Sequence, residues 1–287
     1  MATAQRTVKR LLLGREIAWL RVRQGITQAD LGKVADIRQN RFTLLEDGRA
    51  TITATQLEAI LDRLAITDET YRATLRSMHE GSDETGDWST GYRRAYGDDL
   101  RLLIELEGMA DQYSLVDTEV IPGLLQSDDY IRAMCRPTLR HGLTVDEVVD
   151  AWTQRQQILH KPDAPEFHAI LTESCLTRRQ ADNAVMRAAL EHLIEMSTLP
   201  GVLLQVLPAD VKSEQVPRPS RLLRVPTAGR AGPLRMVYHD TDGEITYSDK
   251  QNKLDHSDAQ LRDLGASAWD ADNTRDFISI VAHRNFK

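Results

Sequence analysis

The stretch GITQADLGKVADIRQNRFTLLEDG, residues 25–48, decides the fold of the N-terminal part of the chain. Thr27 is placed to cap a first helix, whose buried face is predicted from helical spacing to consist of Leu31, Val34 and Ala35. A second helix is predicted to begin near Arg38 and to end at Gly48, a glycine C-cap. Because only about three residues join the helices, they must cross steeply, and the small Gly32 lets them approach closely. This layout is a helix-turn-helix; the alternative is a surface helical hairpin.

The outward residues at the start of the second helix are the candidates for reading DNA bases. If this helix lies in the major groove, the amides of Gln39 and Asn40 can each form paired hydrogen bonds to adenine, whereas Leu44 can contact only a thymine methyl group. Thr43 completes the predicted set of base contacts. We therefore expect half-sites that contain A·T pairs. The alternative interpretation of these polar residues is an ordinary solvated helix face.

Residues 27–48 resemble the helix-turn-helix of the phage-repressor and xenobiotic-response-element (XRE) families. The residues that match the pattern of these families are Thr27, Gln28, Leu31, Ile37, Phe42, Leu45, Glu46 and Gly48. The departures are Asp36 at a usual turn glycine, Arg38 at a usual capping Ser or Thr, and Leu44 at a commonly polar position. The resemblance implies an all-α DNA-binding domain in which Gln28, with Thr27, contacts DNA phosphates.

Charge is distributed unevenly along the chain. The 287 residues carry a net charge of −7, yet residues 1–76 hold 13 Lys and Arg against 9 Asp and Glu, a balance of +4. The remainder has a balance of −11, so only the N-terminal part is suited to approach phosphate. There, Arg38, Arg41 and Arg49 are predicted to add phosphate contacts that weaken with salt.

The length and composition predict a two-domain chain. With 41% hydrophobic and 28% charged side chains, 287 residues can bury two cores. Residues 77–89, SMHEGSDETGDWS, offer almost nothing to bury and are predicted to be a linker. The predicted domains are therefore residues 1–76, an all-α helix-turn-helix domain, and residues 90–287, a larger α+β domain for regulation and dimerisation.

Helices and strands are mixed in the predicted regulatory domain. Helical spacing of apolar residues predicts helices within residues 92–114, 127–134, 144–160, 182–198, 257–269 and 273–286. Apolar runs predict strands at residues 167–173 and 202–208, and the sequence DTDG predicts a hairpin within residues 234–248. The stretches VPRPS and PTAGRAGP, within residues 209–233, are predicted to be loops.

The regulatory domain also resembles that of WhiJ-type actinobacterial regulators. The segments that carry the resemblance are VIPGLLQSDDYIRAM, LIELEGMA, TQRQQIL, LTESCLTRR, NAVMRAALEHL and VLLQVLP. The resemblance implies a transcriptional regulator whose C-terminal domain responds to a small BldB-like protein partner in an antitoxin-like arrangement. Residues 209–233 depart from the pattern of that family. The competing hypothesis is a sensor in which the loops at 215–233 shape a pocket for a small-molecule effector.

The sequence contains none of the catalytic motifs that would indicate an enzyme. Its eight histidines are scattered, and HExxH, GxSxG and P-loop motifs are absent. Glu173, Ser174 and Cys175 adjoin the end of a predicted strand, but an exposed strand terminus explains them better than a nucleophile does. We therefore expect no enzyme activity, no cofactor and no metal.

Assembly and location can also be predicted. A single recognition helix contacts few bases, so we expect a homodimer on an inverted repeat of double-stranded DNA. The sequence has no apolar run long enough for a membrane span, and its N-terminus is unlike a secretory signal. Cys135 and Cys175 are predicted to be unpaired thiols, as in a reducing compartment. These features predict a cytoplasmic, nucleoid-associated protein with no membrane partner.

Overall fold

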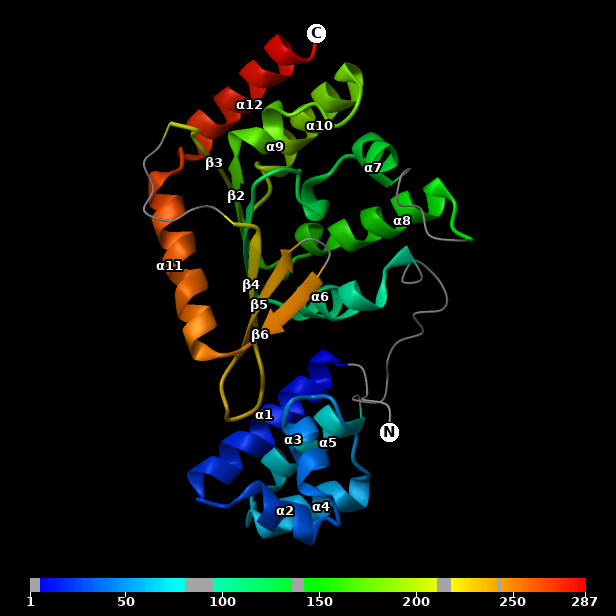
Figure 1. Ribbon diagram of the computed structural model, residues 1–287, viewed down its shortest axis with the longest axis vertical. Helices are drawn as coiled ribbons and strands as arrows, with labels where there is room; N and C mark the ends of the chain where they lie inside the picture. The colour runs from blue at the N-terminus through cyan, green and yellow to red at the C-terminus, as the bar shows by residue number, and fades with distance from the viewer. Residues whose placement is uncertain (1–5, 81–94, 136–141, 211–217, 242–243) are drawn as a thin grey trace. The chain divides into compact units, whose positions relative to one another are not determined.

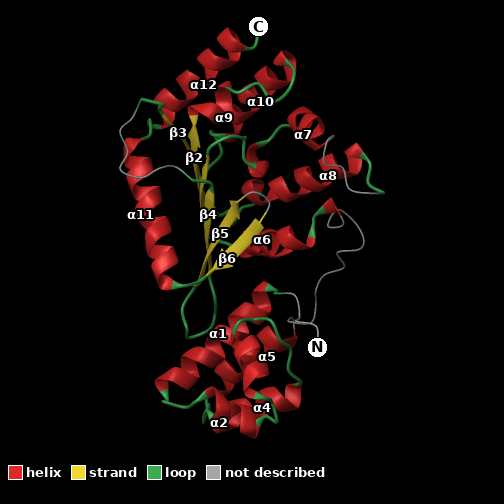
Figure 2. Ribbon diagram, viewed as in Figure 1, coloured by secondary structure: helices red, strands yellow, loops and turns green. Residues whose placement is uncertain are grey.

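The chain divides into two compact units, as a computed structural model shows (Figure 1). The structure describes residues 6–80, 95–135, 142–210, 218–241 and 244–287. Unit 1 comprises Met1–Trp88 and Pro226–Leu234, and unit 2 comprises Ser89–Val225 and Arg235–Lys287. Figure 2 shows that unit 1 is helical, whereas unit 2 combines helices with strands.

The helices of unit 1 form the predicted helix-turn-helix region. They are α1 Val8–Arg23, α2 Gln28–Val34, α3 Gln39–Glu46, α4 Ala54–Arg63 and α5 Glu69–Glu80. α1 packs against α3 and α5, and α2 packs against α3 and α4. Each helix buries apolar side chains, among them Ile17, Leu31, Phe42, Ile60 and Leu75. The prediction of an all-α helix-turn-helix domain at the N-terminal end is therefore confirmed.

The turn between α2 and α3 depends on two residues. Asp36 has a φ of 52°, in the left-handed region that Asp tolerates better than most non-glycine residues do. A Cβ atom on Gly32 would lie 2.5 Å from the carbonyl oxygen of Ile37, so only glycine permits this close approach. The turn therefore forms even though Asp36 replaces the usual glycine.

Some details of unit 1 differ from the predictions. Val34 is 47% exposed rather than buried, because the buried side of the short helix α2 is centred on Leu31 and Ala35 and Val34 falls at its edge. α5 continues to Glu80, because the side chain of Met78 is buried and this burial stabilises the last helical turn. Residues 77–80 of the predicted linker are therefore helical, and residues 81–89 lie outside the described residues.

Unit 2 is built on a six-stranded sheet with the order β3-β2-β1-β4-β5-β6. The strands are β1 Gln112–Asp117, β2 Glu166–Thr172, β3 Val202–Leu207, β4 Ser220–Val225, β5 Leu234–Thr241 and β6 Glu244–Ser248. β1 and β3 both pair with β2 in parallel, whereas β4 pairs with β1 and β6 pairs with β5 in antiparallel orientation. The predicted larger domain of mixed α and β structure is therefore confirmed.

Helices cover both faces of this sheet. They are α6 Asp98–Met109, α7 Asp128–Cys135, α8 Val145–Gln156, α9 Glu173–Thr177, α10 Asn183–Met196, α11 Gln251–Ser267 and α12 Ala271–Asn285. α11 runs along one face, and α6 to α10 lie on the other side (Figure 1). The apolar residues that join α11 to the sheet are Leu254, Leu261 and Leu264 with Val116, Ile170, Leu207, Leu222 and Val237. Among the described residues, no helix has the length and apolar character needed to cross a bilayer.

Two strands in the middle of the sheet were not predicted. β1 lies in the segment predicted to be helical, residues 92–114, but α6 ends at Met109 and Ala110 is already extended. β4 lies between the two predicted loops VPRPS and PTAGRAGP, where no strand was predicted, and its apolar residues are buried. The helix prediction was wrong at β1, and β4 was missed, because a single short strand is stabilised by its neighbours in the sheet rather than by its own sequence.

Candidate functional site

The start of α3 presents the predicted base-reading residues. Gln39 and Asn40 occupy its first turn, Thr43 lies one turn later, and all three side chains are exposed. The Oδ1 of Asn40 accepts a hydrogen bond from the N–H of Arg41 at 2.8 Å. Leu44 is half-buried, so only part of this side chain is available on the surface. These residues form one face of α3, which we call the α3 face: Gln39, Asn40 and Thr43.

A partly buried ion pair fixes the position of α3 behind this face. Glu46, near the end of α3, accepts from the Nε of Arg21 at 2.6 Å and from its Nη2 at 3.0 Å. Glu46 also accepts from the Nε2 of Gln28 at 2.6 Å, and the Oε1 of Gln28 accepts from the hydroxyl of Thr43 at 2.9 Å. The hydrogen bonds to Glu46 raise the pKa of Arg21 above its ordinary value. α1, α2 and α3 are thus held in one arrangement.

The predicted phosphate-contacting residues divide into two groups. Arg38, Arg41 and Arg49 are exposed, and the Nη2 of Arg41 donates to the carbonyl of Thr51 at 2.9 Å. Gln28 is half-buried and bonded to two side chains of α3.

Thr27, the last residue of the predicted phosphate set, makes a capping box with Asp30, and its hydroxyl accepts from the N–H of Asp30 at 3.1 Å. The carboxylate of Asp30 accepts from the hydroxyl of Thr27 at 2.6 Å and from its backbone N–H at 3.4 Å, and these two bonds lower the pKa of Asp30. Gln28 and Thr27 therefore have structural partners in addition to their predicted role on DNA.

Unit 1 contains a second polar site, which the sequence did not predict. Glu16 of α1 is only 2% exposed. Its carboxylate accepts from the backbone N–H of Arg230 at 2.9 Å and of Ala231 at 2.8 Å, and from the hydroxyl of Tyr71. We call this site the Glu16 clasp: Glu16, Tyr71 and the segment 226–234. Because a buried carboxylate is costly without donors, the segment satisfies a group that would otherwise lack partners.

Several further contacts hold segment 226–234 against Glu16, Tyr71 and Asp68. The guanidinium of Arg230 lies 4.0 Å from the centre of the Tyr71 ring and forms an ion pair with Asp68. A Cβ atom on Gly229 would lie 2.0 Å from the Oε1 of Glu16, so no larger residue fits without movement. Burial and the hydrogen bond to Glu16 raise the pKa of Tyr71 well above its ordinary value. Segment 226–234 was predicted to belong to the regulatory domain, but these contacts group it with unit 1.

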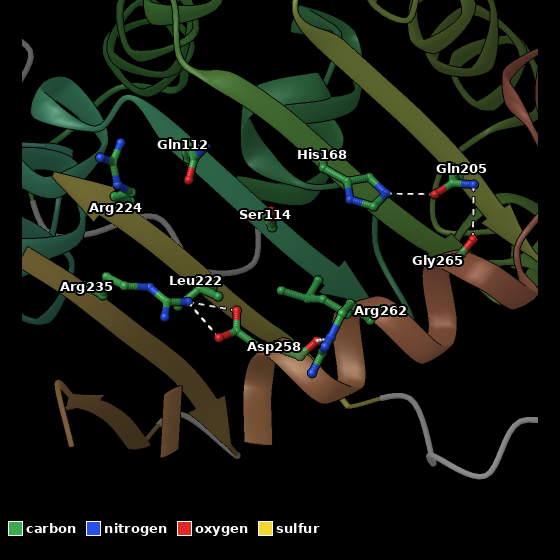
Figure 3. A pocket seen from close by; sticks show the side chains of 11 residues that line it. Gln112, Ser114, His168, Gln205, Leu222, Arg224, Arg235, Asp258, Arg262 and Gly265 are labelled. Carbon is green, nitrogen blue, oxygen red and sulfur yellow. Dashed lines mark hydrogen bonds and ion pairs between the residues drawn. The ribbon is translucent and has the colours of Figure 1, made fainter. Parts of the chain in front are cut away.

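Unit 2 has a pocket of about 390 Å³ on the face of the sheet that carries α11 (Figure 3). The sheet contributes Gln112, Ser114, His168, Gln205, Leu222, Arg224 and Arg235, and α11 contributes Asp258, Leu261, Arg262 and Gly265. The Nε2 of His168 lies 2.8 Å from the Oε1 of Gln205, and burial lowers the pKa of His168. The predicted sensor pocket was placed at the loops 215–233, whereas this pocket is lined by strand and helix residues.

Glu173, Ser174 and Cys175 begin helix α9 rather than an exposed strand terminus, and Cys175 is a buried packing residue. Its thiol is buried and donates to the carbonyl of Asp117 at 3.2 Å, and burial raises its pKa to about 12. A thiol with such a pKa is almost entirely protonated near neutral pH and is a poor nucleophile. Neither Cys175 nor Cys135 takes part in a disulfide. In the part of the chain that the structure describes, no group of three His, Cys, Asp or Glu residues is placed to hold a metal ion.

Comparison with protein-family models gave two matches. The family described as "Domain of unknown function (DUF5753)" matches residues 100–279, and a "Helix-turn-helix domain" matches residues 12–75. No curated protein and no solved structure matched the chain. The first match covers most of unit 2, and the second covers most of the helices of unit 1.

Proposed function

Because the chain belongs to the DUF5753 family and carries a helix-turn-helix domain, we propose that it is a sequence-specific DNA-binding transcriptional regulator of the XRE type. The observation that carries this proposal is the α3 face: amide side chains exposed on the first turn of a helix that Glu46 fixes from behind. Side chains at the start of a recognition helix are those that reach base edges in the major groove. Arg38, Arg41 and Arg49 would contact the flanking phosphates.

The proposal includes a homodimer on an inverted repeat. One α3 face offers three polar side chains, which is too few to select a site in a genome, and a second copy doubles the contacts. Two copies bound with two-fold symmetry would place half-site centres about 34–36 Å apart or a multiple of this. The proposed place of action is the nucleoid in the cytoplasm.

Regulation is proposed to act through segment 226–234. This segment joins β4 to β5 and belongs to unit 1, where it satisfies Glu16. A ligand that changes the ends of β4 and β5 would change the free energy of the Glu16 clasp, and the clasp involves α1, which packs against α3. An effector signal thus has a covalent route to the helix that reads DNA.

Two effectors are candidates for this route. The WhiJ-type resemblance favours a small BldB-like protein partner in an antitoxin-like arrangement. The pocket beside α11 favours the alternative, a small-molecule effector, because it is concave and lined by polar groups. We propose no catalytic role for the chain, a view supported by the buried and protonated thiol of Cys175.

A genome-wide pull-down of bound DNA tests the proposed function. We expect enrichment of a short inverted repeat with A·T pairs in its half-sites, and footprinting should protect both halves. The full chain should have the mass of a dimer in solution. Recovery of random fragments by a monomeric protein would contradict sequence-specific regulation.

A further inference from the structure

We propose that the pocket beside α11 is an effector site for a small organic anion that carries carboxylate or phosphate groups. This inference rests on the proposed function only for its regulatory consequence, because the binding itself needs no DNA. The pocket is lined by three guanidinium groups and one carboxylate: Arg224, Arg235, Arg262 and Asp258. Residues 77–287 have a charge balance of −11, so the excess of positive charge at the pocket is opposite in sign to the charge of this part of the chain.

The arginines of the pocket keep donors available for a ligand. The Nη2 of Arg235 donates to both oxygens of Asp258, at 2.7 and 2.8 Å, and the Nη1 of Arg224 pairs with Asp111. Each guanidinium has five N–H donors, so these ion pairs orient the side chains without using all of their hydrogen-bonding capacity. Such oriented forks match the paired oxygens of a carboxylate or phosphate.

Arg262 supplies the least compensated charge. Its side chain is exposed on α11, and its Nε donates to the backbone carbonyl of Asp258 at 3.4 Å. Among the described residues, no carboxylate forms an ion pair with Arg262. Figure 3 shows Arg224 and Arg235 on neighbouring strands and Arg262 on the helix that lies against the sheet. An anion between these elements would gain contacts from both the sheet and α11.

Neutral donors complete the site. Gln112 and Ser114 of β1 line the same pocket, and their amide and hydroxyl groups can bond to ligand oxygens. The Oε1 of Gln205 faces the Nε2 of His168, and the Nε2 of Gln205 donates to the carbonyls of Gly265 at 3.3 Å and Trp269 at 3.0 Å. These bonds fix one wall of the pocket. A volume of about 390 Å³ suits a small polycarboxylate or a phosphorylated metabolite.

Two arginines of the pocket flank segment 226–234 in the chain, and this position connects the pocket to regulation. Arg224 is the next-to-last residue of β4, and Arg235 directly follows segment 226–234. An anion bound by both arginines fixes the two ends of the segment whose N–H groups hold Glu16. If the conformation of these two ends differs between the free and the bound protein, anion binding changes the free energy of the hydrogen bonds to Glu16.

The test measures thermal unfolding of the full chain without DNA, with citrate and inorganic phosphate as separate probes at matched ionic strength. We expect a saturable rise in Tm with at least one probe, and the probe that saturates distinguishes polycarboxylate from phosphate ligands. The R224Q/R262Q variant should bind the probe more weakly, so that the half-saturating concentration rises at least about tenfold, as expected for lost charged hydrogen bonds. S114D, which adds negative charge to the pocket, should do the same if R224Q/R262Q fails to fold.

The control is R187Q/R284Q, which removes two exposed arginines from α10 and α12, outside the pocket. It should bind the probes like the unchanged chain. A non-saturating rise that is equal in all variants would be the general effect of excluded anions and would overturn the proposal. Saturable binding that leaves DNA affinity unchanged would keep the anion site but remove its regulatory role. Absence of DNA binding by the chain would refute the proposed function alone.

Discussion

Glu16 and Ala231 are joined by a 2.8 Å hydrogen bond from backbone N–H to carboxylate, across 215 positions of the chain. The bond connects α1 to the segment between β4 and β5, and it is short, buried on the Glu16 side and supported by a second bond from Arg230. The buried carboxylate of Glu16 therefore restricts which residues are tolerated both in α1 and in segment 226–234. The segment must offer two N–H groups without side-chain obstruction, which Gly229 makes feasible.

The first prediction concerns Glu16→Ala. The change removes the acceptor for Tyr71, Arg230 and Ala231, so it should lower the free energy of unfolding by about 1–3 kcal/mol. Hydrogen exchange at the amides of Arg230 and Ala231 should accelerate, because their protection depends on Glu16. Urea unfolding and exchange measured by mass spectrometry provide the two readouts. Unchanged exchange in segment 226–234 would show that the clasp does not hold the segment.

A second prediction uses two glycines. Gly229→Ala places a Cβ against Glu16, whereas Gly108→Ala, in α6, meets no atom within 4 Å. We expect Gly229→Ala to lower Tm and to expose segment 226–234 to limited proteolysis. Gly108→Ala should leave Tm unchanged or raise it, because alanine favours the helix. Equal behaviour of the two variants would mean that the close approach at Gly229 is not required.

The third prediction concerns pH. Hydrogen bonds from Arg76 and Arg72 lower the pKa of Glu58 from 4.5 to about 2. A carboxylate with a lowered pKa in the folded state stabilises the fold above its unfolded pKa, and this contribution is lost as the pH falls through the folded value. Glu58→Gln should therefore lower Tm at pH 7 by an amount that stays constant down to about pH 4.5 and then shrinks towards pH 2.

The control for this pH series is Glu191→Gln, on the exposed side of α10. Its Tm should follow that of the unchanged chain throughout the series. If the Tm difference caused by Glu58→Gln were the same at pH 2.5 and pH 7, the pairing of Glu58 with the two arginines would not contribute to stability.

The helix-turn-helix was predictable because its determinants are local. Thr27, Gly32 and Gly48 act within a few residues of their own positions, through a cap, a close approach and a left-handed C-terminal turn. The same locality explains the predictions of α8, with its capping box at Thr144, and of the β5–β6 hairpin. In each case residues close together in the sequence determine the local structure.

The remaining features depend on partners far away in the sequence. β1 and β4 pair with each other across more than 100 residues, so neither was visible as a strand in its own segment. The Glu16 clasp and the pocket likewise join distant segments. One signal for the clasp was present: Glu16 lies on the side of α1 that also carries the buried residues Leu12, Leu13 and Leu20, and a charge on such a side needs a partner.

One measurement tests most directly whether the α3 face reads DNA sequence. The affinities of Gln39→Ala, Asn40→Ala and Arg41→Ala are compared on the selected inverted repeat and on random duplex over a range of salt concentrations. We predict that the first two each lose about 1–3 kcal/mol on the repeat and almost nothing on random DNA. Arg41→Ala should weaken both and reduce the salt dependence by about one unit of slope. Equal losses on both DNAs for all three variants would contradict base reading by the α3 face.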